Sequence, residues 1–115
     1  MTKRKSPNKN KKQPQPEPEQ FVFRAQHFYE LLENQAYRCA LTGRELTPEN
    51  TTAEHIIPLR THGEHRYDNI YLVDEQVSKI KRYLTDEDVV ELAAEIIETR
   101  GYEFGYALKR SRQRE

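Results

Sequence analysis

The chain has 115 residues, enough for one compact domain and too few for two. Hydrophobic residues make up 35% of it and charged residues 33%, and the mean hydropathy is -1.04, so we expect part of the chain to lie outside any packed core. Cys39 is the single cysteine, which excludes an internal disulfide and a zinc site built from cysteine pairs. We expect Cys39 to be a small buried hydrophobic residue.

Membrane and secretory segments are not expected in this sequence. No apolar stretch approaches the roughly 20 residues that a membrane span needs. The lysine-rich start also lacks the apolar run of a secretory signal. We therefore expect a soluble, cytoplasmic protein with no membrane partner.

The formal net charge of zero hides an uneven distribution of charge along the chain. Residues 1–20 hold six basic and two acidic residues with four prolines, and residues 109–115 hold four basic residues and one acidic residue. Of the 19 basic and 19 acidic residues, nine and 16 therefore remain for residues 21–108. We expect a disordered basic arm over 1–20, a folded domain over 21–108 and a basic tail over 109–115. The basic ends suit binding to a polyanion, or alternatively they only keep the protein soluble.

Helical spacing of apolar residues begins soon after the basic arm. Phe28, Leu31 and Leu32 fall on one face of the segment Ala25–Ala36, which predicts a helix there. Tyr37–Leu41 is expected to form a short strand or an extended run ahead of a glycine-containing turn.

Two segments of high β propensity follow, separated by a polar loop. Ala53–Ile57 stops at a proline and Asn69–Val73 is rich in β-forming residues, so the two predict a hairpin with a long loop. From Asp74 the pattern changes to helical spacing. A last amphipathic helix begins at a capping box over Thr85–Asp88 and ends at Gly101, and we expect its apolar face to pack on the core. This order of elements indicates an α+β fold.

Glu54, His55 and Asn69 are the residues of this hairpin that suit phosphodiester chemistry. Hydrolysis of a phosphodiester needs a general base that takes a proton from water, and a cation that neutralises the charge growing on the phosphate. Histidine suits the first task, and a hard divalent cation with oxygen ligands suits the second. Neighbours on a regular strand point to opposite faces, so Glu54 and His55 can serve one phosphate only if the strand ends or bulges there. Asn69, fourteen positions after His55, offers an amide that can orient the imidazole.

Several short stretches of the chain resemble one known family. They are CALTG at 39–43, AEHIIPL at 53–59, GEH at 63–65, DNI at 68–70 and a following helix that ends in Lys81. At these positions the chain is similar to the HNH endonucleases, in the compact form common in bacteriophage and bacterial genomes. The resemblance covers about residues 37–97 and implies a ββα-metal (His-Me finger) core. Such a core binds one divalent cation, Mg²⁺ or Mn²⁺, and nicks or cuts DNA.

The resemblance also implies a role for each matching residue. The acidic metal ligand falls on Glu54, the general base on His55 and the base-orienting asparagine on Asn69. The second metal ligand falls on Ser78, where the family has His or Asn, so we expect a lower affinity for metal. Basic and histidine residues around the motif are expected to contact DNA; they are Arg60, His65, Arg66, Lys79 and Lys81.

A metal-dependent DNA endonuclease is therefore the leading hypothesis, and two alternatives stay open. Ser78 favours a catalytically weakened HNH domain that acts as a DNA-binding module. The other alternative is a small interaction protein that holds a partner with its apolar helices, although this leaves the trio of Glu54, His55 and Asn69 unexplained.

Overall fold

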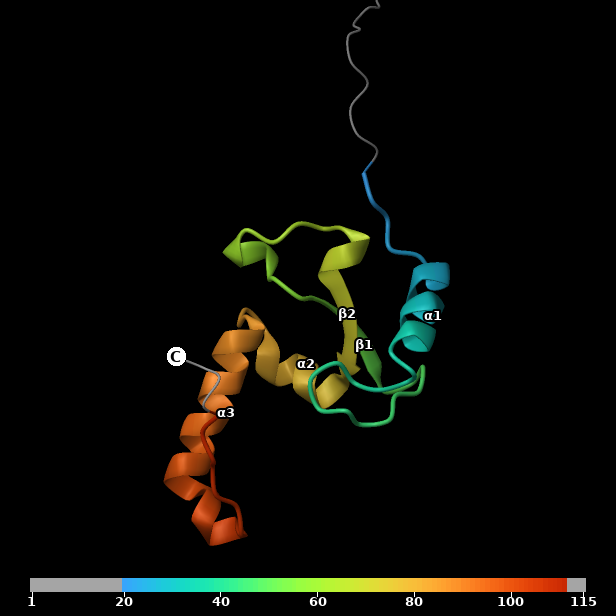
Figure 1. Ribbon diagram of the computed structural model, residues 1–115. Coiled ribbons are helices and arrows are strands. Elements are labelled where there is room, and N and C mark those ends of the chain that lie inside the picture. The colour runs from blue at the N-terminus through green and yellow to red at the C-terminus, as the bar shows by residue number, and fades with distance from the viewer. Residues whose placement is uncertain (1–19, 112–115) are drawn as a thin grey trace, which may run out of the picture.

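The computed structural model describes residues 20–111, which form three α-helices and one β-hairpin (Figure 1). The elements follow the order α1, β1, β2, α2, α3, with short 3₁₀ turns in the loop of the hairpin and after α3. This mixture of helix and strand confirms the α+β class. Residues 1–19 of the expected basic arm and residues 112–115 of the expected tail lie outside the described residues.

Helix α1 spans Ala25–Asn34 and packs against β2 with its apolar face. Leu31 and Leu32 are buried, as the helical spacing predicts. Just beyond the helix, Gln35 Oε1 accepts a hydrogen bond from Leu72 N at 2.9 Å, and Gln35 Nε2 donates to Leu72 O at 3.0 Å. The side-chain amide thus satisfies backbone groups of β2 on the edge away from β1 and fixes α1 against the hairpin.

The segment after α1 is more irregular than expected. In place of a strand over Tyr37–Leu41, the structure has a single bridge between Arg38 and Glu45. Ala36 and Tyr37 have positive φ angles of 54° and 60°. Two consecutive left-handed residues turn the chain sharply out of the helix, so no regular extended run begins there.

Strands β1 (Thr51–His55) and β2 (Ile70–Asp74) form a two-stranded antiparallel sheet. The strand β1 begins and ends two residues earlier than predicted, and β2 begins and ends one residue later. The ladder stops at His55 because the backbone of Ile57 bonds to the side chain of Asn69 and not to the opposite strand.

Helix α2 spans Glu75–Lys81 and starts directly after β2, where the sequence pattern changes to helical spacing. Asp74 is its N-cap, because Asp74 Oδ1 accepts a hydrogen bond from Gln76 N at 3.1 Å. The other carboxylate oxygen accepts a hydrogen bond from Arg44 Nη1 at 2.7 Å. This hydrogen bond to Arg44 is the main cause that lowers the pKa of Asp74 below its usual range. The start of α2 is thereby fixed to the loop that precedes β1.

The hydrophobic core lies around β2, whose five residues are all buried. Residues from α1, from the loop after it and from α2 close over this strand: Leu31, Leu32, Cys39, Leu46 and Val77. Cys39 is only 3% exposed, which confirms the expected small buried residue. Since each fully buried apolar side chain contributes roughly 1.5–3 kcal/mol, this cluster is what holds α1 and α2 on the hairpin.

Helix α3 spans Asp86–Arg100 and ends at Gly101, as predicted. A 3₁₀ turn begins at this glycine. The predicted capping box is present: Thr85 Oγ1 accepts a hydrogen bond from Asp88 N at 3.1 Å, and Asp88 Oδ2 accepts one from Thr85 N at 3.2 Å. No helix within residues 20–111 has the length and apolar character needed to cross a membrane.

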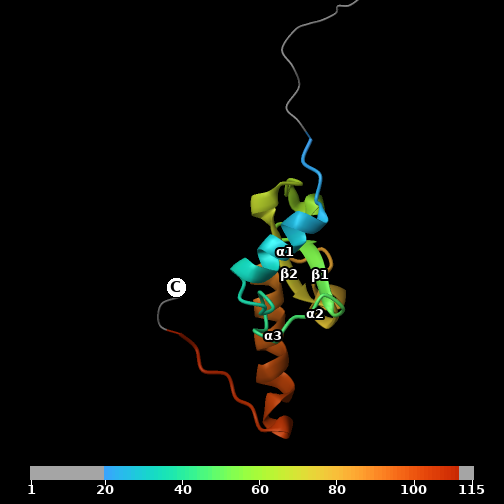
Figure 2. The same cartoon turned by 90° about the vertical axis from the view of Figure 1, so that its right-hand side faces the viewer.

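The expectation that α3 packs on the core is wrong. No residue of α3 is buried, and the helix extends away from the hairpin (Figures 1 and 2). Val90 and Ile96 on its apolar side are 59% and 54% exposed. The turn before the helix sets this direction: Arg82 ends α2 with a positive φ of 42° and leads the chain away from the sheet.

Candidate active site

Glu54 and His55 lie at the end of β1 where the long loop of the hairpin begins. Glu54 pairs with Tyr71 of β2, and His55 pairs with Ile70. Successive strand residues point to opposite faces, so the two side chains have different neighbours. Because the strand ends at His55, both nevertheless line one small cavity of about 160 Å³, together with Phe23 and others.

On the α2 side of the hairpin, Glu54 meets Ser78. Ser78 Oγ donates a hydrogen bond to Glu54 Oε2. The two residues are 24 positions apart in the chain, and they meet because α2 begins directly after β2. The structure thus brings together the two residues that the resemblance assigns to a metal. They offer a carboxylate and a hydroxyl, both of which are hard oxygen donors.

A cation held by this pair would have few protein ligands. Within residues 20–111, no group of three or more His, Cys, Asp and Glu side chains gathers in a way that could hold a metal ion. Mg²⁺ is commonly held by one or two carboxylates and keeps several waters in its shell. One carboxylate and one hydroxyl therefore fit a water-rich Mg²⁺ or Mn²⁺ site, and they do not fit a closed zinc site with four protein ligands.

On the other face, His55 contacts a second histidine from the loop between the strands. His55 Nε2 lies 2.9 Å from His65 Nδ1. Partial burial, and then the nearby His65, lower the pKa of His55 below its usual range, while Glu54 acts in the opposite direction. The neutral imidazole that this favours is the form that accepts a proton.

Asn69 holds the loop that follows His55 and does not touch the imidazole. Asn69 Oδ1 accepts a hydrogen bond from Ile57 N at 2.9 Å, and Asn69 Nδ2 donates to Ile57 O at 3.0 Å and to Glu64 O at 2.8 Å. One amide therefore ties both limbs of the loop together. Any orientation of His55 by Asn69 is indirect and acts through the backbone just beyond the histidine.

Gly63 allows the two limbs of this loop to lie in contact. A Cβ placed on Gly63 would lie 1.8 Å from the carbonyl oxygen of Ile57, a distance that no side chain can tolerate. The glycine in the family-like GEH stretch is thus required by close backbone contact.

The basic residues expected to contact DNA have different surroundings. Lys79 is exposed on α2. Arg60 is exposed, and its guanidinium lies 4.1 Å from the ring centroid of Tyr83. Arg66 donates to both carboxylate oxygens of Asp68, at 3.2 and 3.3 Å, so part of its charge is already matched. Lys79 and Arg60 are accordingly the better placed of these side chains for phosphate contacts.

The prediction that Lys81 contacts DNA is wrong, because the side chain of Lys81 is fully buried. Lys81 Nζ donates to Ile56 O at 3.2 Å and to Leu84 O at 2.6 Å, and it lies 4.0 Å from Asp86 Oδ1. The ammonium joins the end of β1 to the turn before α3 and is not accessible to a phosphate. The sequence signal for this role was the spacing of four residues from Val77, which puts Lys81 on the buried face of α2.

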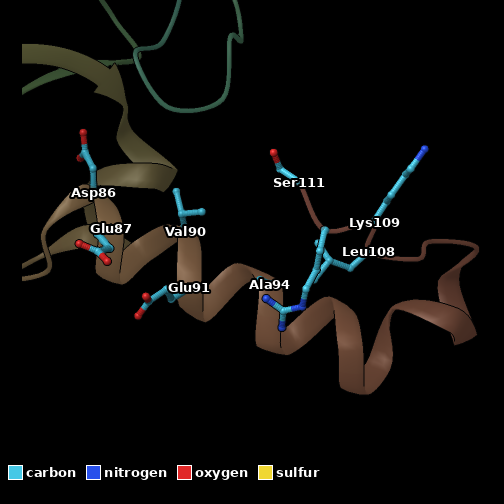
Figure 3. Close-up of a pocket in the computed structure, with 9 residues that line it drawn as sticks. Asp86, Glu87, Val90, Glu91, Ala94, Leu108, Lys109 and Ser111 are labelled. Carbon is cyan, nitrogen blue, oxygen red and sulfur yellow. The ribbon is translucent and has the colours of Figure 1, made fainter. Parts of the chain in front are cut away.

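A larger hollow of about 490 Å³ lies between α3 and residues 108–111 (Figure 3). Acidic and small apolar side chains of α3 line one side, and the returning chain lines the other. Arg110 bonds to Glu98 at 2.8 Å and ties this chain end to the helix. None of the candidate site residues lines this hollow.

The end of β1 thus carries an imidazole on one face and two oxygen donors on the α2 side. No protein-family model matches the chain, and no curated protein matches its sequence. His55 offers a partly exposed imidazole that can take a proton. Glu54 and Ser78 offer oxygen ligands on the α2 side of the hairpin, and Asn69 keeps the loop after His55 in place.

Proposed function

We propose that the protein is a metal-dependent endonuclease that hydrolyses phosphodiester bonds of DNA. The observation that carries this proposal is the contact of Ser78 with Glu54, the residue next to His55, where β1 enters the loop of the hairpin. The resemblance to HNH endonucleases assigns Glu54 and Ser78 to a metal ion and His55 to the general base. The order of β1, long loop, β2 and α2 agrees with a ββα-metal core, which we propose for residues 51–81.

His55 acts as the general base in the proposed reaction. Its imidazole takes one proton from a water molecule, whose oxygen bonds to phosphorus while the bond from phosphorus to the leaving oxygen breaks. The leaving oxygen takes its proton from solvent. A divalent cation held by Glu54 and Ser78 would neutralise charge on the phosphate. Asn69 keeps the backbone beyond the base in place through its two bonds to Ile57.

A plasmid-nicking assay tests this proposal directly. The full-length protein is incubated with supercoiled DNA and Mg²⁺, Mn²⁺ or EDTA, and we expect nicking with either ion and none with EDTA. His55→Ala should lower the nicking rate by about 100-fold or more, because it removes the base but leaves Glu54 and Ser78 in place. His62→Asn is a matched control, since His62 lies in the same loop with a φ of 70° that asparagine tolerates. The control should nick at the normal rate.

Two outcomes would redirect the proposal. Normal nicking by a folded His55→Ala variant would show that His55 is not the base.

Ser78 also supports a second function, a DNA-binding module without catalysis, because a hydroxyl is a weak metal ligand. Binding of DNA in a mobility-shift assay, with no nicking under any of the ions, would favour that second function.

A further inference from the structure

Two histidines face each other at the candidate site. His55 Nε2 lies 2.9 Å from His65 Nδ1, and the ring planes meet at 69°. At this distance one nitrogen carries a hydrogen and the other accepts it, because two hydrogens or two lone pairs facing each other would repel. Each neutral imidazole has one N–H group and one lone pair. The direction of this hydrogen bond therefore decides which nitrogen of His55 keeps a free lone pair.

Contacts from two parts of the chain hold His65 in this place. The ring centroid of Phe21, from the stretch before α1, lies 5.1 Å from that of His65. Phe23 lines the cavity that both histidines line. The carbonyl of Glu64, the residue before His65, accepts the hydrogen bond from Asn69. The hydrogen bond from Asn69 to the loop and the phenylalanine rings near His65 thus position this histidine together.

The more stable direction of the bond has His55 Nε2–H donating to His65 Nδ1. Both rings then carry their hydrogen on Nε2, which is the more stable neutral tautomer of free histidine. The reverse direction would put both rings in the less stable tautomer. Within residues 20–111, His55 Nδ1 makes no hydrogen bond, so the donating arrangement leaves its lone pair without a protein partner.

We propose that His65 is a positioning residue for His55. It accepts the Nε2 hydrogen and so makes Nδ1 the nitrogen that takes the proton from water. This inference rests on the proposed function of the site, and it gives His65 a role other than the expected DNA contact. When Nδ1 gains the proton, the bond from the His55 imidazolium to neutral His65 becomes charge-assisted and stronger. His65 receives no proton and steadies the charged ring.

The first test measures the tautomer of His55 and needs no nuclease activity. Long-range ¹H–¹⁵N correlation spectra are recorded on the full chain with ¹⁵N-labelled histidine, at a pH where both rings are neutral. We expect the hydrogen on Nε2 of His55 and a bare nitrogen at Nδ1. In His65→Ala the two tautomers should mix, as in free histidine. His65→Asn should restore the Nε2–H form, because the amide oxygen accepts in place of His65 Nδ1.

Two spectroscopic results would overturn the inference. One is a hydrogen on Nδ1 of His55 in the wild type. The other is an unchanged tautomer population in a His65→Ala variant that melts at the same temperature as the wild type.

The second test separates positioning from DNA contact by kinetics. We expect His65→Ala to lower kcat for nicking by about tenfold or more with little change in KM for DNA. His65→Asn should recover most of this loss, and the control His62→Asn should change neither constant. A raised KM with unchanged kcat would make His65 a DNA contact and refute the positioning role.

Failure of the inference and failure of the proposed function give different results. A protein that shows the fixed tautomer but nicks no DNA would refute the nuclease and leave the pairing of His55 with His65 intact. A protein that nicks DNA with a tautomer insensitive to His65→Ala would refute the role of His65 alone.

Discussion

Ser78 Oγ carries one hydrogen, and that hydrogen goes to Glu54. The bond orients the carboxylate, and the serine oxygen keeps its lone pairs for a cation. A hydroxyl is a weaker ligand than the carbonyl oxygen of an amide, and the serine side chain is one atom shorter than that of asparagine. Waters and phosphate oxygens would therefore fill most of the shell of a bound Mg²⁺. Mn²⁺, which binds N and O ligands more strongly than Mg²⁺, is expected to support better activity.

Ser78→Asn is expected to strengthen metal binding at the proposed site. The amide adds a carbonyl ligand close to Glu54, so half-maximal nicking should need less Mg²⁺ than in the wild type. Ser78→Ala is the matched variant and should need more, because it removes an oxygen and changes little else. The measurement is the rate of nicking over a series of Mg²⁺ concentrations. If all three proteins have the same half-maximal concentration and fold equally well, Ser78 does not face the ion.

The sequence predicts which residues meet at the site better than which atoms they touch. The contact of Glu54 with Ser78 follows from motif spacing, because a hairpin and the helix directly after it have regular geometry. The partners of Asn69 depend on the path of an irregular loop, which spacing does not encode. Its amide meets Ile57 and not the imidazole. The contact of His65 with His55 could not be predicted for the same reason.

Helix α2 is only seven residues long and is held at both ends. Asp74 caps its start, and the buried ammonium of Lys81 bridges its end to neighbouring elements. Lys81 Nζ also lies 5.7 Å from the ring centroid of Tyr71, whose hydroxyl donates to Asp86 Oδ1 at 2.6 Å. A buried ammonium is stable only when its hydrogens are bonded to acceptors. This network therefore fixes the end of α2 against the end of β1.

Lys81→Met is expected to destabilise the protein without weakening DNA binding. Methionine keeps most of the buried stem but leaves two backbone carbonyls without their donor, which costs about 1–3 kcal/mol. Lys79→Met, on the exposed face of the same helix, should change the free energy of unfolding by less than about 0.5 kcal/mol. Denaturant unfolding measures both. Lys79→Met should instead lower DNA affinity, and equal stabilities of the two variants would contradict the structural role of Lys81.

Element order and helix caps are predictable here because they depend on local residues. The capping box over Thr85–Asp88 is one example. Strand ends are less predictable, since the β propensity of Ile56 and Ile57 favours continuing β1 beyond His55. The side chain of Asn69, twelve residues after Ile57, bonds to the backbone of Ile57, and the ladder ends before this residue.

Residues 20–111 divide into a core around β2 and a projecting helix, α3 (Figure 2). An amphipathic pattern shows that a helix has an apolar side but not which way the chain turns before it. Here the turn at Arg82, with its positive φ, carries α3 away from the core. The expected packing of α3 therefore failed although its residue range and caps were right.

Substitutions in α3 and in α1 should have very different costs. Ile96→Ser replaces a side chain that is 54% exposed and should change the free energy of unfolding by less than about 0.5 kcal/mol. Leu32→Ala removes a side chain that is 1% exposed and should cost about 2–5 kcal/mol. Thermal or denaturant unfolding of the full chain distinguishes them. A cost for Ile96→Ser close to that of Leu32→Ala would mean that α3 packs on the core in solution.

Charge is the property of the whole chain that bears most on the proposed DNA partner. Residues 21–108 hold nine basic and 16 acidic residues, so this part as a whole repels a polyanion. Within it, exposed cations such as Lys79 can give local phosphate contacts. In the tail, Arg110 is already paired with Glu98 at 2.8 Å. Residues 1–19, which hold six Lys and Arg against two acidic residues, therefore have the largest excess of basic charge in the chain.

Deleting residues 1–19 is expected to weaken DNA binding and to flatten its dependence on salt. Each phosphate contact adds about one to the slope of log affinity against log salt concentration, so losing six cations should lower the slope by up to about five. A full-length variant with these six residues changed to Gln separates charge from length and should behave like the deletion. Under saturating DNA, the rate of nicking should stay near normal in both, because Glu54, His55 and Ser78 are untouched. An unchanged salt slope in both variants would show that the arm does not contact DNA.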